Sequence, residues 1–226
     1  METNNQKFKI KVKYNGPYVV TGGVPLVDLT METDEQGLSV RWKEGKQYPV
    51  QERYELCRCG KSKNKPFCDD AHHDFPFDGT ETASHEPVIA QAEPVTTGPE
   101  LELIDIPVLC SSARFCDRAG GAWDNTRASD DPEAKKTAIE LVGSCPAGRL
   151  LLRGKDGQLI EPKFEPSIGA VFDPIIKDIG PLWVRGGLAI ESADGYVYEI
   201  RNRVTLCRCG VSTNKPFCDG KHCDSE

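Results

Sequence analysis

Apolar residues occur along the chain in short, branched runs separated by Gly and Pro, a pattern typical of short β-strands. Residues 16–26 read Gly-Pro-Tyr-Val-Val-Thr-Gly-Gly-Val-Pro-Leu, and the pattern returns at 180–190 as Gly-Pro-Leu-Trp-Val-Arg-Gly-Gly-Leu-Ala-Ile. Each stretch predicts two short strands divided by a Gly-Gly pair. The chain therefore contains an internal repeat.

A turn signal follows the strands in each copy of the repeat. Asp194-Gly195 lies between alternating apolar residues, which indicates a hairpin, and residues 33–37 occupy the same place before a return strand at 38–42. Each half is thus predicted to form a small antiparallel sheet, with a larger hairpin in the longer first copy. Since each unit is too small to bury its own face, we expect a packed pseudo-two-fold pair rather than two separate beads on a linker.

A different pattern separates the two halves. Residues 79–107 are punctuated by Pro and Glu and are weakly apolar, so they predict an extended surface connector. Asp131 before Pro132 is typical of a helix N-cap, and the apolar face that follows predicts a helix that ends at Gly143.

Composition narrows the classes of function. The 226-residue chain is 38% apolar and carries a net charge of −7 without a basic cluster, so neither a nucleic acid nor a membrane partner is expected. The N-terminus lacks a secretory pattern and no run is long enough to span a bilayer, which predicts a soluble, cytoplasmic protein. Ten cysteines in a reducing compartment favour metal binding over disulfides. Cys223 is interpreted as a spare thiol.

The candidate chemistry lies in one stretch that occurs twice, at residues 56–72 and 206–222. Three cysteines and one histidine recur there at identical intervals. An extended Cys-x-Cys pair places both thiols on one side of the chain, and the last Cys and His, four residues apart, share one face of a helical turn. The candidate ligands are Cys57, Cys59, Cys68 and His72 in the first copy and Cys207, Cys209, Cys218 and His222 in the second.

The four donors of each copy satisfy more than one kind of metal. Tetrahedral zinc accepts three thiolates and one imidazole, although Cys-x-Cys is less typical of structural zinc sites than a Cys-x2–4-Cys knuckle. In the intervening loop, backbone N–H groups are expected to point at sulfur. The hydroxyl of Ser62 either joins them or belongs to a plain turn residue.

At these residues both stretches resemble the CDGSH-type iron–sulfur proteins, also called NEET proteins, whose pattern is Cys-x-Cys-x2-Ser/Thr-x3-Pro-x-Cys-Asp-Gly-x-His. The resemblance covers roughly residues 16–75 and 180–223 and is closest to the class with two motifs in one chain. It implies two 2Fe-2S clusters, with each Cys-x-Cys pair on an inner iron and each Cys–His pair on an outer iron. Asp70 departs from the pattern, which has Gly, and Asp tolerates a positive φ better than most residues.

The resemblance implies electron transfer or cluster transfer to a redox or cluster-acceptor protein, without enzymatic activity. Replacing a thiolate by a neutral imidazole raises the reduction potential, and the remaining ring nitrogen couples the electron to a proton. The alternatives are a zinc-binding structural or interaction module and an electron-transfer subunit of an oxidoreductase complex. His73 and His85 are expected to be solvated.

The middle of the chain resembles a divergent single-cluster ferredoxin domain through Cys110, Cys116 and Cys145-Pro146. A cubane cluster usually has four cysteine ligands, and Ser112 occupies a position where relatives offer a histidine. The segment therefore either holds a third cluster or has lost its cofactor and packs, and the missing fourth cysteine favours the second. A redox-active Cys110–Cys116 dithiol is a further alternative.

These observations predict an α+β fold: a β-rich, pseudo-two-fold pair of CDGSH halves with short helical turns at the clusters, plus a ferredoxin-like insert. The predicted boundaries are 1–78 for the first half, 79–175 for the linker and insert, and 176–226 for the second half. We expect a monomer with an internal pseudo-dimer and two 2Fe-2S clusters.

Overall fold

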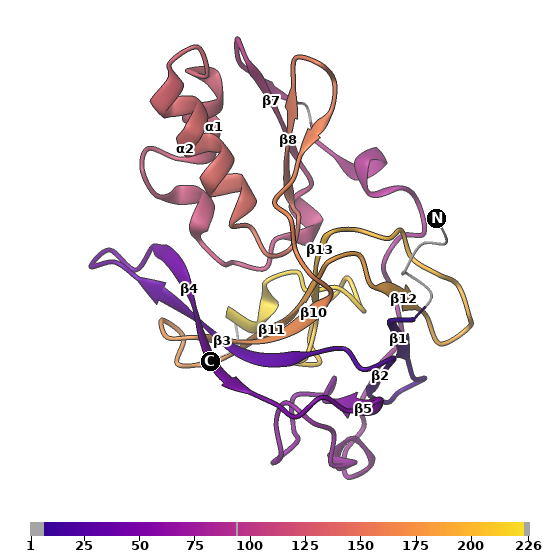
Figure 1. Cartoon of the computed structure of the whole chain (residues 1–226). Helices are drawn as coiled ribbons and strands as arrows, with labels where there is room; N and C mark the ends of the chain where they lie inside the picture. The colour runs from indigo at the N-terminus through magenta and orange to yellow at the C-terminus, as the bar shows by residue number, and fades with distance from the viewer. Residues whose placement is uncertain (1–6, 94, 224–226) are drawn as a thin grey trace.

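A computed structural model of the chain describes residues 7–93 and 95–223. It contains short strands in three sheets and few helices, as expected for an α+β fold (Figure 1). The strands of the two repeats are β1 (Lys9–Val12), β2 (Tyr18–Thr21), β3 (Leu26–Thr33), β4 (Ser39–Gln47), β5 (Arg53–Leu56), β10 (Ser167–Asp173), β11 (Asp178–Arg185), β12 (Ala189–Glu191) and β13 (Arg203–Leu206). The insert contributes β6 (Thr96–Thr97), β7 (Leu101–Asp105), β8 (Leu150–Gly154), β9 (Leu159–Ile160), α1 (Ala122–Arg127) and α2 (Pro132–Gly143).

Two of the sheets combine strands from both ends of the chain. Their orders are β12-β1-β2-β5 and β13-β11-β10-β3-β4. β1 pairs in parallel with β12, and β10 pairs in parallel with β3, whereas the other neighbours are antiparallel. The prediction of one antiparallel sheet per half is therefore wrong, because the second half contributes β12 to the first sheet and the first half contributes β3 and β4 to the second.

The Gly-Gly pairs redirect the chain at these crossings. Gly22, Gly23, Gly186 and Gly187 all have positive φ, a conformation that residues with a Cβ rarely adopt. The strand that follows each pair leaves its own sheet and joins the other one. One apolar core spans both sheets, including Ile10, Leu182 and residues of both halves around them.

The hairpin of the first half is larger than its counterpart, as predicted. β3 and β4 are eight and nine residues long, whereas β12 has three residues and returns only through a bridge between Glu191 and Val197. Figure 1 shows the β3–β4 hairpin extending away from the body. Most side chains of β4 are exposed, so the extension adds surface rather than core.

The insert is a four-stranded sheet, β6-β7-β8-β9, packed against α1 and α2. α2 begins as predicted: Pro132 is its first residue and the Asp131 side chain accepts a hydrogen bond from Glu133 N. The surface connector predicted over 79–107 is wrong at its end, because β7 is buried between β6 and β8. α1 was not predicted.

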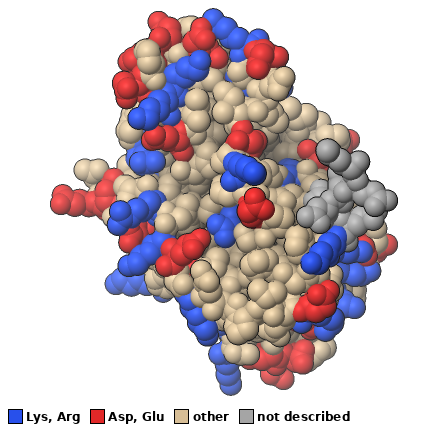
Figure 2. All heavy atoms as spheres, viewed as in Figure 1, with Lys and Arg blue, Asp and Glu red and all other residues tan. Residues whose placement is uncertain are grey.

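The insert is packed against the two-sheet body. Ile104, Ile106, Leu109 and Ala147 belong to the same apolar cluster as the strands of both halves. β10, which lies before the boundary drawn at residue 175, pairs with β11 and β3. Figure 2 shows positive and negative side chains interspersed on the face that it presents. Within the described residues, every helix falls short of the length and apolarity needed to cross a membrane.

Candidate metal centres

Each repeat brings its two Cys-x-Cys thiols together at the end of a strand. Cys57 follows β5 and Cys207 follows β13, and both sulfurs are buried. The Sγ–Sγ distance is 3.8 Å between Cys57 and Cys59 and 3.5 Å between Cys207 and Cys209. The segment that follows each strand therefore places the two thiols of each pair together, although it lies beyond the strand end.

The remaining cysteine of each motif lies just before a short 3-10 turn that carries the histidine. His72 lies in η2 (Ala71–His73) and His222 in η6 (Lys221–Cys223). Cys68 Sγ lies 3.6 Å from His72 Nδ1, and Cys218 Sγ lies 3.5 Å from His222 Nδ1. The sequence-predicted donors therefore form two close pairs in each copy, and Nδ1 is the ring nitrogen that faces the thiol.

Backbone geometry in the loop orients these thiols. Asp70 N donates to Cys68 Sγ over 3.4 Å, and the Asp69 carboxylate accepts from Lys63 N and Ala71 N. The Ser62 hydroxyl instead donates to Phe67 O over 2.7 Å, so Ser62 is a turn residue and does not bond to sulfur. Backbone N–H groups supply the hydrogen bonds that orient the ligands.

The same turn appears in the second copy. Ser212 Oγ donates to Phe217 O, and Asp219 accepts from Thr213 N and Lys221 N. Both loops also contain a cis Lys–Pro bond, at Lys65–Pro66 and Lys215–Pro216. The loops are thus local copies of one another.

Burial controls the protonation of the thiols. It raises the pKa of Cys68 to about 11 and holds the pKa of Cys218 well above its usual value. A hydrogen bond from Cys209 lowers the pKa of Cys207 to about 6, and the same bond raises the pKa of Cys209. Cys68, Cys209 and Cys218 therefore favour the protonated thiol at neutral pH, and a metal cation that binds there would have to displace the proton.

The two motif loops also contact one another reciprocally. A Cβ added at Gly60 would lie 2.7 Å from Cys209 O, and one added at Gly210 would lie 2.9 Å from Cys59 O. Tyr18 of the first half donates to Cys207 O over 2.6 Å. Only glycine permits this approach of the backbones, so the two donor sets belong to one packed unit.

The arginine inside each Cys-x-Cys pair is buried on the opposite side from the thiols. Arg58 donates to Gly79 O and Lys13 O, and Arg208 donates to Gly180 O and Val171 O. Burial lowers the pKa of Arg208 to about 10. The hydrogen bonds of these arginines join the motif loops to neighbouring backbone segments. Their position between two cysteines is the only feature of the sequence that indicates this role.

Asp70 joins the donors of the first copy. Its carboxylate, Cys68 Sγ and a ring nitrogen of His72 all lie within 4.8 Å of one another. Asp70 has a φ of 64°, and its counterpart Gly220 has a φ of 84°. The departure from the CDGSH pattern is therefore compatible with the backbone, and it adds a carboxylate that the second copy lacks.

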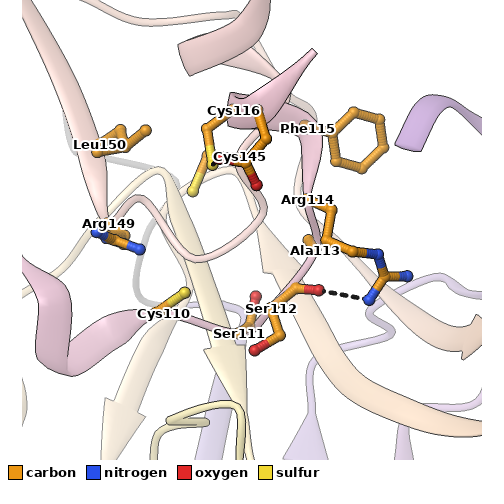
Figure 3. A pocket seen from close by; sticks show the side chains of 11 residues that line it. Cys110, Ser111, Ser112, Ala113, Arg114, Phe115, Cys116, Cys145, Arg149 and Leu150 are labelled. Atoms are coloured by element: carbon orange, nitrogen blue, oxygen red, sulfur yellow. Dashed lines mark hydrogen bonds between the residues drawn. The ribbon is translucent and has the colours of Figure 1, made fainter. Parts of the chain in front are cut away.

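The three insert cysteines line one cavity of about 230 Å³ together with Ala113 and Arg149 (Figure 3). Arg149 forms a two-point ion pair with Asp105, at 2.7 and 2.8 Å, and lines the cavity together with Cys110. Burial raises the pKa of Cys116 to about 12. Arg149 was not among the predicted site residues, and its only signal in the sequence is a cation four residues after Cys145.

Three other predicted positions have defined surroundings. His73 is exposed, as expected, and its ring lies 4.2 Å from that of His72. His85 is exposed as well, but its ring stacks on Tyr196 at 3.8 Å. Cys223 lies half-buried in η6.

The paired cysteine and histidine donors are typical of a metal-binding protein. Family models identify the class of these centres: residues 15–73 and 179–223 match the iron-binding zinc finger of CDGSH type, and residues 96–155 match a divergent 4Fe-4S mono-cluster segment. The chain thus carries two CDGSH segments with a mono-cluster segment between them, as the sequence resemblance implied, and an iron–sulfur cofactor is supported. Neither the curated proteins nor the solved structures contain a match.

Proposed function

We propose that the chain binds two 2Fe-2S clusters and acts in electron transfer or cluster transfer. Each cluster is held by three cysteines and one histidine, with the Cys-x-Cys pair on one iron and the Cys–His pair on the other. The ligands are Cys57, Cys59, Cys68 and His72 at the first site and Cys207, Cys209, Cys218 and His222 at the second.

The separation of the donors into pairs is the observation that carries this proposal. Zn–S bonds of about 2.3 Å place the sulfurs of a tetrahedral zinc site about 3.8 Å apart, so all four donors of such a site are close neighbours. Among the described residues, neither quartet has three donors that all lie within 4.8 Å of one another. Two close pairs at a larger mutual distance fit two bridged irons better than one ion.

The histidine gives each site its particular chemistry. A 2Fe-2S cluster supplies one-electron redox chemistry, and an imidazole ligand raises its potential relative to four thiolates. His72 presents Nδ1 to Cys68, so Nδ1 is the ligand atom and Nε2 carries the exchangeable proton. Protonation of Nδ1 at low pH would detach the ligand. We therefore propose proton-coupled redox behaviour and acid-dependent release.

The arrangement of the two sites supports a monomer with an internal pseudo-dimer. Apart from the additional β4, the corresponding strands follow one another in the same order: β12-β1-β2-β5 in the first sheet and β3-β10-β11-β13 in the second. The reciprocal Gly60 and Gly210 contacts resemble the self-complementary contacts of a two-fold interface. We propose a carrier rather than an enzyme, in the cytoplasm, with a redox or cluster-acceptor protein as partner.

Metal analysis and spectroscopy test this proposal. We expect a red-brown protein with visible absorption that bleaches with dithionite. Metal analysis of protein purified without chelator should find iron as the main metal. A colourless protein with stoichiometric zinc would contradict it and favour a zinc-bound interaction module.

A ligand exchange tests the role of the imidazole. His222→Cys replaces a neutral ligand by a thiolate, so it should lower the potential of the second cluster and make that cluster more acid-stable. His72→Cys is the matched variant at the first site. An unchanged pH dependence of both potential and bleaching in the two variants would refute proton coupling through histidine.

A further inference from the structure

The cavity of the insert is large enough for a cluster and has the donors of one. Its volume of about 230 Å³ far exceeds the roughly 30 Å³ of a single water molecule. Cys110, Cys116 and Cys145 line it from three segments of the chain, and Figure 3 shows their side chains approaching the same space. The side chains around this space do not fill it, as they would in a domain that had lost its cofactor and repacked.

The spacing of the cysteines shows which ligand is missing. A four-iron cluster is commonly bound by a Cys-x2-Cys-x2-Cys run and a distant Cys-Pro. Here Cys110 and Cys116 occupy the first and third positions of such a run, Cys145 precedes Pro146, and Ala113 stands at the second position. Ala113 also lines the cavity, and its methyl group cannot bind iron.

We propose that the insert binds a three-iron 3Fe-4S cluster through Cys110, Cys116 and Cys145, and that Ala113 marks the corner where the fourth iron is absent. This assignment differs from the four-iron cluster implied by the matched family model. It does not rest on the function proposed for the CDGSH sites.

The charge around the cavity fits an anionic cluster. Arg149 lies at the wall beside Cys110, held there by its two-point ion pair with Asp105. A guanidinium offers donors to cluster sulfur and compensates negative charge in a partly buried site. Only Asp117 adds a carboxylate to the lining residues.

The cavity also lies against the second CDGSH site. A Cβ added at Gly220 would lie 3.0 Å from Cys110 O and 2.5 Å from Ser112 Oγ. Arg203, which lies four residues before Cys207, donates to Cys145 O over 2.9 Å. Two of the three proposed ligands are thus held by contacts with the segment that carries the second site.

Iron counting distinguishes the possibilities in the full chain. After anaerobic reconstitution with iron and sulfide, we expect about seven irons per chain: two in each 2Fe-2S cluster and three in the insert. Oxidised 2Fe-2S clusters are diamagnetic, so an EPR signal in the oxidised sample reports the three-iron cluster. Anaerobic handling ensures that this signal is not an oxidation product of a four-iron cluster.

Ala113→Cys is the decisive variant. It supplies the missing thiolate, so the iron content should rise to about eight per chain and the oxidised EPR signal should disappear. Ala113→Ser is the matched control and should retain the signal. Cys145→Ala should lower the count to about four while the visible spectrum of the CDGSH sites is retained, which also shows that the variant folds.

Two results would overturn the assignment. Four irons in the wild-type chain, unchanged in Cys145→Ala, would show that the cavity holds no cluster. Eight irons without an oxidised EPR signal would show a four-iron cluster with a ligand other than cysteine, and Asp117→Asn would then test the carboxylate. Because Cys145→Ala isolates the insert's share of the iron, failure here is distinguishable from failure at the CDGSH sites.

Discussion

The two CDGSH motifs are nearly identical in sequence, yet they occupy different surroundings. In the first motif Cys68 is half-buried and Asp70 is exposed, whereas Cys218 is 2% exposed and Gly220 is buried. The insert causes this difference, because its Cys110–Ser112 segment covers the turn of the second motif. The same turn therefore lies at the surface in the first motif and in contact with the insert in the second.

The difference explains the departure from the CDGSH pattern. Gly220 has no room for a side chain, but Asp70 has open solvent beside it and keeps the same left-handed backbone. Phe75 and Phe77, which follow the first motif, pack on its Cys-x-Cys pair instead of the insert. The turn of the first motif therefore faces solvent, whereas the turn of the second motif faces the insert.

We expect the largest difference between the two halves at an arginine in the strand before each motif. Arg203 is 1% exposed, whereas Arg53 at the equivalent position is exposed and pairs only with Glu55. The partners of Arg203 are Val142 O, Cys145 O, Leu150 O and the carboxylate of Glu161.

Arg203→Ala removes this buried cation and leaves several acceptors without a donor. We expect a loss of about 3–5 kcal/mol, which corresponds to a fall in Tm of roughly 10 °C for a chain of this size. Arg53→Ala is the matched control and should change stability by about 0.5 kcal/mol or less. Equal effects of the two variants in thermal unfolding would contradict the asymmetry.

Exchanging the residues that differ within the turns should have a smaller effect. Gly220→Asp places a Cβ 2.5 Å from Ser112 Oγ, and overpacking of this kind costs about 1–3 kcal/mol. The clash, and not the backbone, is responsible, because Asp70 adopts the same conformation.

The reciprocal change, Asp70→Gly, restores the pattern in open space and should cost about 1 kcal/mol at most. Thermal unfolding of the two variants side by side measures the difference. If Gly220→Asp is as mild as Asp70→Gly, the insert does not cover the second turn as tightly as the contact distances indicate.

The sequence predicted the close pairs of candidate ligands because each pair lies within a few residues of the chain. Cys57 and Cys59 are two residues apart just after a strand, and Cys68 and His72 are four residues apart around a 3-10 turn, so their spacing in the sequence identifies the pairs. The N-cap at Asp131 is equally local and was also predicted correctly.

The errors arose where partners lie far apart in the chain. The parallel pairing of β1 with β12 joins residues near opposite ends, and the alternation of apolar residues does not reveal which sheet a strand joins. The prolines that flank β7 predict a connector, whereas the segment between them forms a mostly buried strand. The contact of Gly220 with Cys110 and Ser112 depends on how the insert packs, so it cannot be predicted from the sequence of the motif.

The smallest expected difference concerns loss of metal at low pH. Burial lowers the pKa of His222, so its imidazole remains neutral to a lower pH than an ordinary histidine of pKa about 6.5. Neutral imidazole is the form that binds metal. Cys218 is also more buried than Cys68, which slows access of acid or chelator to the second site.

As the pH falls from 7 to 5 in the presence of a chelator, we therefore expect visible absorption to bleach in two phases, with the first site losing its metal before the second. His72→Cys should abolish the faster phase, and His222→Cys should abolish the slower one. A single phase would contradict a difference between the two sites. Loss of the faster phase in His222→Cys would show that the second site loses its metal first. Asp70→Gly removes the carboxylate that only the first site has, so the difference in rate that remains in this variant reflects the cover of the second site by the insert and the packing of Phe75 and Phe77 on the first.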